Sequence, residues 1–244
     1  MSSLYLDETL ELAALAPGAE LRLTGDEARH AVTVARVRPG ERISIGDGRG
    51  VVVRGQVVAT APRELTLLAE EILVEERPEI TVTLVQALAK GDRDELAVQA
   101  ATELGVDAVV PWAAARSVSR WEGPKAEKGR ARWAGIVREA VKQSIRSWLP
   151  EVASITTTAQ LPTRFAGVRM LLLEPTATMP LSELRPDGRD LALVVGPEGG
   201  IAPEELAKLT AAGAEPVRLG ASVLRTSTAG PAAIAVLNAA LGRW

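Results

Sequence analysis

The sequence predicts an α/β protein in which a mainly parallel sheet follows a small β-barrel. From residue 80 to residue 241, apolar strand-like runs alternate with helix-like segments, a rhythm typical of a parallel sheet with helices on both faces. Residues 21–68 instead hold short β-forming runs separated by turn-forming pairs. The 244-residue chain, with 47% hydrophobic and 24% charged residues, has the composition of a globular protein that buries a core.

The first domain is expected at residues 1–74, ahead of a boundary near residues 75–79. The pattern predicts strands at residues 21–23, 42–45, 51–58 and 64–68. One helix, from about residue 25 to residue 37, interrupts them. The glycine-rich run at residues 46–50 predicts a hairpin turn and not a phosphate loop, because it joins two short strands.

The second domain is expected at residues 75–244. The pattern predicts strands at residues 80–88, 108–111, 170–173, 191–195 and 216–219, and helices at residues 92–104, 130–148, 203–212 and 228–241. Three of these strands end in turns, at residues 173–176, 195–200 and 219–228. Glycine amides in such turns can approach a flat heterocycle or a carboxylate closely. We therefore expect a ligand pocket at the carboxyl edge of the sheet.

The composition excludes several kinds of chemistry. The chain has no cysteine and a single histidine, His30, which excludes disulfides and cysteine nucleophiles and argues against a metal site or a histidine triad. Catalysis must then use carboxylates, hydroxyls, Arg, Lys or a cofactor. The sequence contains no apolar run of membrane-spanning length and no signal-peptide pattern, so we expect a cytoplasmic protein with no membrane partner.

The charge is unevenly distributed along the chain. The net charge is −3, yet residues 112–148 hold nine Lys or Arg against three Glu, and residues 28–55 hold six Arg against two acidic residues. Each cluster alone could be a solvated surface. Two clusters in separate segments favour a polyanionic partner.

Seven motifs, in order, carry a resemblance that covers nearly the whole chain. They are His-Ala-Val-Thr-Val-Ala-Arg-Val-Arg-Pro-Gly at 30–40, Ala-Leu-Ala-Lys-Gly-Asp-Arg at 87–93, Gln-Ala-Ala-Thr-Glu-Leu-Gly-Val at 99–106, Ala-Arg-Ser-Val at 115–118, Gln-Ser-Ile-Arg at 143–146, Gly-Pro-Glu-Gly-Gly at 196–200 and Leu-Arg-Thr at 224–226. The sequence resembles the small-subunit (16S) ribosomal RNA uracil-N3 methyltransferases, the RsmE-like family of the SPOUT superfamily.

This resemblance implies a PUA-like β-barrel that helps to grip RNA, followed by a SPOUT α/β domain with a deep trefoil knot. It implies that S-adenosyl-L-methionine binds in the knot and that the protein is a homodimer. The apolar side chains of the last helix independently suggest a partner surface, because Ile234, Val236, Leu237 and Leu241 need to be covered.

The resemblance also assigns the cofactor site residue by residue. Most contacts would be made by backbone atoms of three loops. The matching positions are Leu173, Glu174, Pro175, Val195, Gly196, Gly199, Gly200, Leu219, Gly220, Val223, Leu224, Arg225 and Thr228.

Two residues are candidates for catalysis. Methylation at N3 of uracil needs loss of the N3 proton and in-line attack on the activated methyl group, so a fixed guanidinium such as Arg225 would stabilise the developing anion. Arg225 could instead form an ion pair with Glu198 or with a helix end. Glu198 could be the general base, a helix cap or a loop support. Ser227 stands where many family members have Glu, which argues against an essential carboxylate there.

The candidate RNA contacts are basic residues in both domains, with phosphates as their targets. They are Arg29, Arg36, Lys90, Arg93, Arg116 and Arg146. Trp121 is a candidate for stacking on a base. Family chains often begin with an Arg-aromatic pair, whereas this chain begins Met1-Ser2, so an RNA contact from that arm is not expected.

The resemblance thus predicts an S-adenosylmethionine-dependent methyltransferase that modifies N3 of one uridine in 16S ribosomal RNA, in the context of the small ribosomal subunit. Two alternatives stay open at this point. One is a SPOUT methyltransferase with a different nucleotide specificity. The other is an RNA-binding assembly protein that has kept the fold without turnover.

Overall fold

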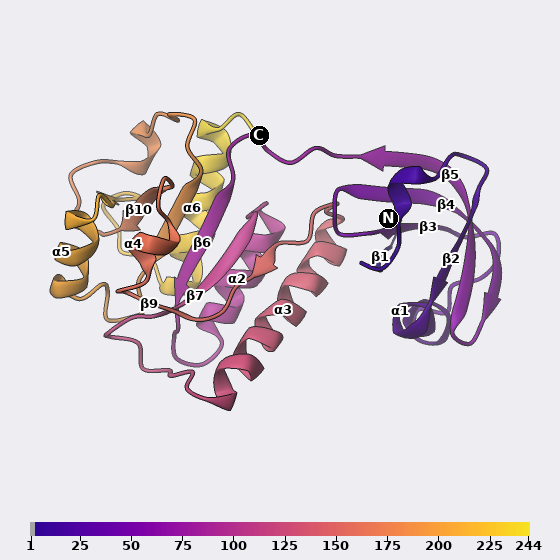
Figure 1. The fold of residues 1–244 in the computed structure, drawn as a ribbon, viewed down its shortest axis with the longest axis horizontal. Coiled ribbons are helices and arrows are strands. Elements are labelled where there is room, and N and C mark those ends of the chain that lie inside the picture. Colours follow the sequence, from indigo (N-terminus) through magenta and orange to yellow (C-terminus); the bar gives the residue numbers. More distant parts are fainter. Residues whose placement is uncertain (1–2) are drawn as a thin grey trace. The chain divides into compact units, whose positions relative to one another are not determined.

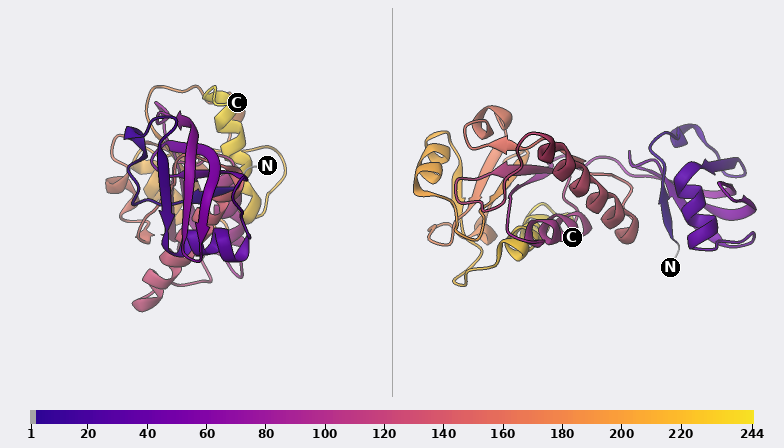
Figure 2. Two further views of the ribbon diagram at one scale, coloured as in Figure 1. Left: turned by 90° about the vertical axis from the view of Figure 1, so that its right-hand side faces the viewer. Right: turned by 90° about the horizontal axis from the view of Figure 1, so that it is seen from below.

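The computed structural model describes residues 3–244, which form two compact units. The first unit holds the chain up to Arg77 together with Val141–Leu149, and the second holds Pro78–Ala140 and Pro150–Trp244. Figures 1 and 2 show the elements of each unit from three directions. The return of Val141–Leu149 to the first unit is a long-range contact that no local sequence pattern indicated.

The first unit is built on a curled five-stranded sheet in the order β1-β3-β4-β5-β2 (Figure 1). The strands are β1 (Leu4–Leu6), β2 (Glu20–Thr24), β3 (Arg42–Gly46), β4 (Val51–Ala61) and β5 (Glu64–Val74). Four of them were predicted, although β4 and β5 extend further than expected. The sequence pattern missed β1, a strand of three residues that pairs in parallel with β3. Met1 and Ser2, where the family's aromatic arm would begin, lie outside the described residues.

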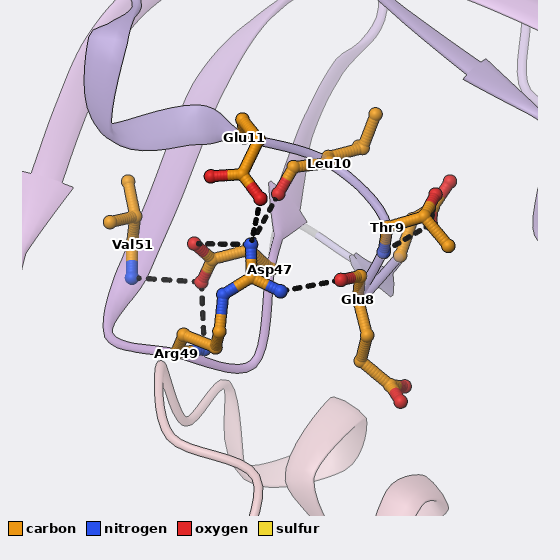
Figure 3. A network of polar contacts seen from close by, with 8 residues as sticks. Glu8, Thr9, Leu10, Glu11, Asp47, Arg49 and Val51 are labelled. Atoms are coloured by element: carbon orange, nitrogen blue, oxygen red, sulfur yellow. Dashed lines mark hydrogen bonds and ion pairs between the residues drawn. The ribbon is translucent and has the colours of Figure 1, made fainter.

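The hairpin turn predicted at residues 46–50 is confirmed, because β3 and β4 pair in antiparallel orientation on either side of it. The Asp47 carboxylate accepts hydrogen bonds from the N–H groups of Arg49 (2.7 Å) and Val51 (3.1 Å). The Arg49 guanidinium donates to the carbonyl oxygens of Glu8 and Leu10 and so ties the N-terminal segment to the turn (Figure 3). This arginine of the basic cluster therefore has a structural role.

The helix predicted at residues 25–37 is shorter and irregular. It consists of α1 (Gly25–Arg29) and a π-helical turn, η2 (His30–Val34). It ends there because Arg36 has a φ of 58°, a left-handed conformation that cannot continue a right-handed helix. Ala28 and Ala31 are fully buried and pack into the core inside the sheet.

The second unit contains a seven-stranded sheet in which every pairing is parallel, in the order β12-β10-β11-β6-β7-β8, with β9 also paired to β7. The strands are β6 (Val82–Ala87), β7 (Ala108–Ala113), β8 (Glu151–Val152), β9 (Thr156–Thr157), β10 (Arg169–Leu173), β11 (Leu191–Val195) and β12 (Glu215–Val217). The predicted parallel sheet is confirmed; the short edge strands β8 and β9 were not predicted.

Helices cover both faces of this sheet, as expected (Figure 1). On one face, alternate residues of β10 and β11 pack with α4 (Leu161–Arg164) and α5 (Pro203–Ala211). On the other face lie α2 (Arg93–Glu103) and α6 (Thr226–Ala240), which pack against each other and against β6. The central strands β6, β10 and β11 are mainly apolar because both faces of the sheet are covered there.

The long basic helix α3 (Pro124–Ser144) begins and ends earlier than the predicted residues 130–148. Ile145 ends it with a φ of 55°. The chain beyond then binds the first unit's hairpin, where the N–H of Gly50 donates to the Ser147 carbonyl (3.1 Å) and the N–H of Leu149 donates to the Gly48 carbonyl (2.9 Å). Pairing with a distant turn thus replaces the last helical turn that the local sequence favours.

The apolar last helix does not by itself require a partner subunit. Ile234 and Leu237 are fully buried within the second unit, where α6 packs on α2. Val236 and Leu241 are half-buried. Packing inside one chain therefore accounts for Ile234 and Leu237, two of the four residues on which the dimer prediction was based.

No helix in residues 3–244 combines the length and the apolar character needed to cross a membrane.

Candidate functional site

The carboxyl ends of four neighbouring strands lie in one row. Val195, the last residue of β11, is opposite Gln86 of β6 on one side and Leu173 of β10 on the other. Leu173 is in turn opposite Val217 of β12. The loops that follow these strands therefore leave the sheet at the same edge, where parallel α/β sheets form ligand-binding crevices.

A pocket of about 640 Å³ lies at this edge, lined by the three loops singled out in the sequence. Twelve of the thirteen predicted cofactor-binding residues line it: Leu173, Glu174, Pro175, Val195, Gly196, Gly199, Gly200, Leu219, Gly220, Val223, Leu224 and Arg225. Thr228 is not in the lining and is exposed on the first turn of α6. The structure thus brings the three loops together, and the role of each residue stays a prediction.

The pocket also includes residues that the sequence analysis missed. Arg218 and Thr226 are the most informative, since each directly adjoins a residue that was predicted. Arg218 precedes Leu219 at the end of β12, so extending the third loop back by one residue would have included it. Thr226 belongs to the Leu-Arg-Thr motif, but nothing in the local sequence indicated what its hydroxyl group contacts.

The loop after β11 folds back tightly, which favours glycine. A Cβ atom on Gly196 would lie 3.0 Å from the backbone nitrogen of Ile201, closer than most Cβ contacts in proteins. Gly200 has a φ of 72°, a conformation that glycine adopts without strain. A Cβ atom on Gly200 would meet nothing within 4 Å, so the backbone there is open to a ligand.

Glu198 belongs to this loop, lines the pocket and ties the loop to the segment after β6. Its carboxylate oxygen Oε1 accepts hydrogen bonds from the Lys90 N–H (3.0 Å) and from the Arg93 guanidinium (2.8 Å), both in the segment after β6. Partial burial raises the pKa of Glu198, but the hydrogen bonds from its own backbone, from Lys90 and from Arg93 outweigh this effect and lower the pKa below its ordinary value. Of the roles considered for Glu198, the geometry matches the loop support.

Arg116 holds the same loop from the segment after β7. Its guanidinium donates to the Gly199 carbonyl oxygen (2.8 Å), and its side chain fills the space where a Gly199 Cβ would lie. Arg93 and Arg116, both nominated for RNA, line the pocket and connect its second loop to two neighbouring strands.

The buried carboxylate of Glu205 fixes the base of the Arg116 segment. It accepts hydrogen bonds from the Ala115 N–H (2.9 Å) and from the Thr158 hydroxyl (2.5 Å). The same carboxylate accepts a longer bond from the Ala202 N–H (3.4 Å), at the start of α5. Because Glu205 is only 8% exposed, these partners compensate for the loss of its hydration.

Arg225 occupies the N-cap position of α6 and lines the pocket. Its side chain is exposed and forms no ion pair within residues 3–244. The alternative pairing with Glu198 does not occur, because Glu198 pairs with Arg93. The guanidinium of Arg225 therefore keeps its charge and its donors available to a bound molecule.

The remaining candidate RNA contacts are divided between the units. Arg29 and Arg36 are exposed at the α1 and η2 segment of the first unit, and neither side chain makes an ion pair with another described residue. Arg146 is half-buried in the segment that joins the first unit. The side chain of Lys90 is exposed beside the pocket loop in the second unit.

Trp121 packs against α3. Its ring contacts that of Trp133 edge to face, with centroids 5.1 Å apart and planes at 72°, and it lies directly over Gly129 of α3. The five tryptophans include Trp112 and Trp133 as fully buried residues. Packing accounts for the position of Trp121, and its ring is half-buried.

The described residues contain no cluster of three or more His, Asp or Glu side chains that could hold a metal ion.

The sequence matches two family models. Residues 75–238 match an RNA methyltransferase domain, and residues 23–70 match an RNA methyltransferase PUA domain. Among curated proteins, the chain is 44% identical to ribosomal RNA small subunit methyltransferase E of Mycobacterium bovis, covering 93% of this chain and 89% of that protein. It is 33% identical to the protein of the same name from Bacillus subtilis, covering 85% of each.

Solved structures agree with this assignment. The ribosomal RNA small subunit methyltransferase E of Neisseria gonorrhoeae, crystallised with S-adenosyl methionine, superposes with a TM-score of 0.86 at 27% identity over 98% of both chains. A putative methyltransferase of Legionella pneumophila, also in complex with this cofactor, gives 0.82 at 26% identity over 98% of both chains. The expected fold, a SPOUT methyltransferase domain behind a PUA-like domain, is confirmed. The chain belongs to the ribosomal RNA small subunit methyltransferase E family.

Proposed function

We propose that this protein transfers a methyl group from S-adenosyl-L-methionine to N3 of a uridine in 16S ribosomal RNA. The observation that carries the proposal is the pocket formed at one sheet edge by the loops after β10, β11 and β12. The relatives that bind this cofactor in crystals share the fold over 98% of the chain. The reaction belongs in the cytoplasm, where small ribosomal subunits are found.

The pocket suits the cofactor because part of its lining is glycine backbone. Gly200 and Gly220 line it and have open space where a side chain would start, so their peptide groups can contact an adenine edge or a carboxylate. The loops from Leu173, Gly196 and Leu219 would hold the molecule. The cofactor supplies the activated methyl group, and the protein has to orient the base and stabilise charge.

Arg225 is the residue suited to stabilising charge. Loss of the N3 proton leaves a uracil anion, whose charge is shared with the carbonyl oxygens on either side. A guanidinium at the pocket wall, without a carboxylate partner among the described residues, stabilises that anion electrostatically. The reaction requires no cysteine, because the protein itself forms no covalent bond with the ring, and the chain has no cysteine.

Glu198 is a loop support in this proposal and not the general base. We expect Glu198→Gln to weaken cofactor binding a few-fold, since Gln keeps the size of the side chain but loses the charge-assisted bond to Arg93. The pH dependence of kcat between pH 6 and pH 9 should keep its shape. Cofactor titration by calorimetry and initial rates across this range measure both effects. A general base would instead show a fall in kcat of about 10²- to 10⁴-fold, and that result would contradict the assignment.

The lowered pKa of Glu198 also predicts how its contribution to stability depends on pH. Because its pKa is lowered in the folded protein, its ionised form stabilises the loop above the ordinary value near 4.5, and this contribution is lost as the pH falls through the lowered value. Wild type and Glu198→Gln should therefore differ in stability at neutral pH and converge in acid.

The RNA would contact both domains, residues 1–74 as the PUA-like RNA-binding domain and residues 75–244 as the methyltransferase domain. The positive charge for the phosphates would come from basic residues of both units. These are Arg29, Arg36 and Arg146 in the first unit and Lys90, Arg93 and Arg116 in the second. The family model for a PUA domain at residues 23–70 supports the first assignment.

We also expect the protein to be a homodimer, as the family resemblance implies. The prediction no longer depends on Ile234 and Leu237 of α6, which are buried within the chain. Sedimentation velocity at micromolar concentration should give about twice the mass of the 25.7 kDa chain. A species with the mass of one chain would contradict it.

The test of the function is methyl transfer from labelled S-adenosylmethionine to small ribosomal subunits that lack their native uracil-N3 methylation, followed by nucleoside mass spectrometry. We expect 3-methyluridine. Another methylated nucleoside would keep the enzyme class and overturn the specificity. Cofactor binding without any methylated product would favour an RNA-binding assembly protein.

A further inference from the structure

A polar side chain lies in the middle of the second unit's hydrophobic sheet. Gln86 is on β6, a strand with β11 on one side and β7 on the other, and it is fully buried. Its neighbours Leu84, Val85 and Ala87 are apolar and also fully buried. A buried amide is costly unless its hydrogen bonds are made, so its partners indicate its role.

The Gln86 side chain starts a chain of hydrogen bonds that ends in the pocket. Its Nε2 donates to the Thr226 hydroxyl (3.0 Å), and the Thr226 hydroxyl donates to the Gly196 carbonyl oxygen (2.8 Å). Gln86 Nε2 also donates to the carbonyl of Ala87 (3.1 Å). Thr226 lies at the start of α6 and Gly196 at the start of the second pocket loop, so the two hydrogen bonds connect a central strand, a helix and a loop.

The direction of these bonds is fixed by the number of hydrogens. A threonine hydroxyl has a single hydrogen, and the Gly196 carbonyl can only accept, so that hydrogen points toward Gly196. Only a lone pair of the hydroxyl is left for Gln86, which must therefore present its NH₂ group. The other end of the amide, Oε1, is buried with no hydrogen-bond partner among the described residues. The fold thus tolerates one unsatisfied acceptor to place the NH₂ group.

The packing of α6 keeps this arrangement rigid. A Cβ on Gly230, one turn beyond Thr226, would lie 3.1 Å from Leu84 Cδ1, 3.5 Å from Val195 Cγ2 and 3.6 Å from Gln86 Oε1. Glycine at this position lets the first turn of the helix lie close to β6 and β11. This close approach brings the Thr226 hydroxyl within reach of both partners.

We infer that Gln86 and Thr226 are positioning residues for methyl transfer, which set the third pocket loop against the second. The inference rests on the proposed function of the pocket. Thr226 directly follows Arg225, and Gly196 lines the pocket, so the two bonds hold the guanidinium and the cofactor loop in one fixed relation. Neither side chain needs to touch the reacting atoms to affect the rate, because a small displacement of a catalytic group slows a reaction strongly.

The experiment uses the full chain with Thr226→Val, which keeps the shape of the side chain and removes the hydroxyl, and with Thr226→Ser, which keeps the hydroxyl. We expect Thr226→Val to raise the Kd for S-adenosylmethionine about 3- to 10-fold and to lower kcat at saturating cofactor about tenfold or more. In Thr226→Ser both values should stay within about twofold of wild type, because serine keeps the hydroxyl group and its hydrogen bonds.

Gln86→Leu provides an independent variant, since Leu suits a buried apolar strand. It removes the hydrogen bonds from Gln86 to the Thr226 hydroxyl and to the Ala87 carbonyl but leaves the bond from Thr226 to Gly196 in place, so its effects should be smaller than those of Thr226→Val. The double variant should be no worse than Thr226→Val alone, because Gln86 acts through Thr226. Thr102→Val is the matched control, because the Thr102 hydroxyl is also buried and donates to a carbonyl, that of Val98 within α2 (2.8 Å), away from the pocket lining.

Changes in thermal stability alone would overturn the inference. If Thr226→Val and Gln86→Leu melt at lower temperature but keep wild-type cofactor affinity and wild-type kcat, the two residues are merely structural. An equal loss of cofactor affinity in Thr102→Val would also overturn the inference, because it would show that losing any buried hydroxyl group has this effect. Failure of the proposed function is a separate result, namely wild-type protein that yields no 3-methyluridine, and calorimetric cofactor binding by the variants is measured independently of that product.

Discussion

Replacing Arg225 by alanine is expected to lower kcat for methyl transfer about 10²- to 10³-fold, the usual effect of removing one charge-stabilising donor from an active site. The fold should be unaffected, because the side chain is exposed and makes no ion pair within residues 3–244. The backbone of Arg225, which accepts hydrogen bonds from the N–H groups of Thr228 and Ala229, is unchanged by the substitution. Transfer of labelled methyl groups to unmethylated small subunits measures the effect.

Two further variants serve as comparisons for Arg225→Ala. Arg225→Lys keeps the charge but loses the planar, forked donors, so we expect only partial activity. Arg185→Ala removes an exposed arginine of the same unit that does not line the pocket, and it should leave kcat unchanged. Near-normal turnover by Arg225→Ala would remove Arg225 from the mechanism, whereas a thermal transition well below that of wild type would mean that the side chain supports the fold.

The largest effect on stability is expected from Gly55→Ala in the first unit. Gly55 lies in β4 where the pairing with β5 is irregular, and a Cβ atom there would lie 2.0 Å from the Leu68 carbonyl oxygen. The two strands must separate to accommodate it, which should cost about 3 kcal/mol of folding free energy. Urea denaturation measures the loss, and hydrogen exchange in peptides from residues 51–74 shows whether it arises in this hairpin.

Gly46→Ala is the control on the neighbouring strand β3. A Cβ at Gly46 would meet Leu4, Leu6 and Val52 at 3.4 to 3.5 Å, which is ordinary contact, and its φ is not in the left-handed region. We expect a change within about 1 kcal/mol, as for a tolerated small substitution in a packed site. Equal loss in the two variants would mean that the close approach at Gly55 is not what limits substitution.

The pocket's second loop is held from three sides by side chains distant from it in the sequence. Glu198 is tied to the segment after β6, Arg116 reaches Gly199 from the segment after β7, and the Thr226 hydroxyl reaches Gly196 from α6. These contacts give the basic residues Arg93 and Arg116 a structural part in the cofactor site. A bound phosphate would compete for the guanidinium of Arg116, because its present partner is a neutral carbonyl.

Much of the fold could be predicted from local sequence. The strand at residues 191–195 is predicted with the bounds of β11, and the helix at residues 203–212 differs from α5 by one residue. Short continuous apolar runs are typical of sheet strands with both faces covered, and proline followed by acidic residues is typical of a helix start. The three loops that line the pocket were also predicted, since proline or glycine shortly after a buried strand is typical of a turn at the edge of a sheet.

The differences between the structure and the sequence-based predictions have a common physical cause. The end of α3 was predicted too late because its last turn is replaced by pairing with Gly48 and Gly50, roughly 100 residues away. The continuous helix after residue 25 was interrupted by a π-helical turn and by the left-handed Arg36. Ile234 and Leu237 of α6 were expected to need a partner, although both are buried within the chain. In each case the folded chain departs from what its local sequence favours.

The sequence by itself determined the alternation of strands and helices, the glycine turns and the absence of cysteine chemistry, because these depend on residue type and short-range spacing. The tertiary structure alone decided which side chains meet: Gln86 with Thr226, Glu198 with Arg93, and Arg116 with Gly199. Such pairs join residues 83 to 140 positions apart, and no periodicity connects them. Their meeting depends on the order in which parallel strands assemble into the sheet, which places the ends of β6, β7, β10, β11 and β12 at one edge.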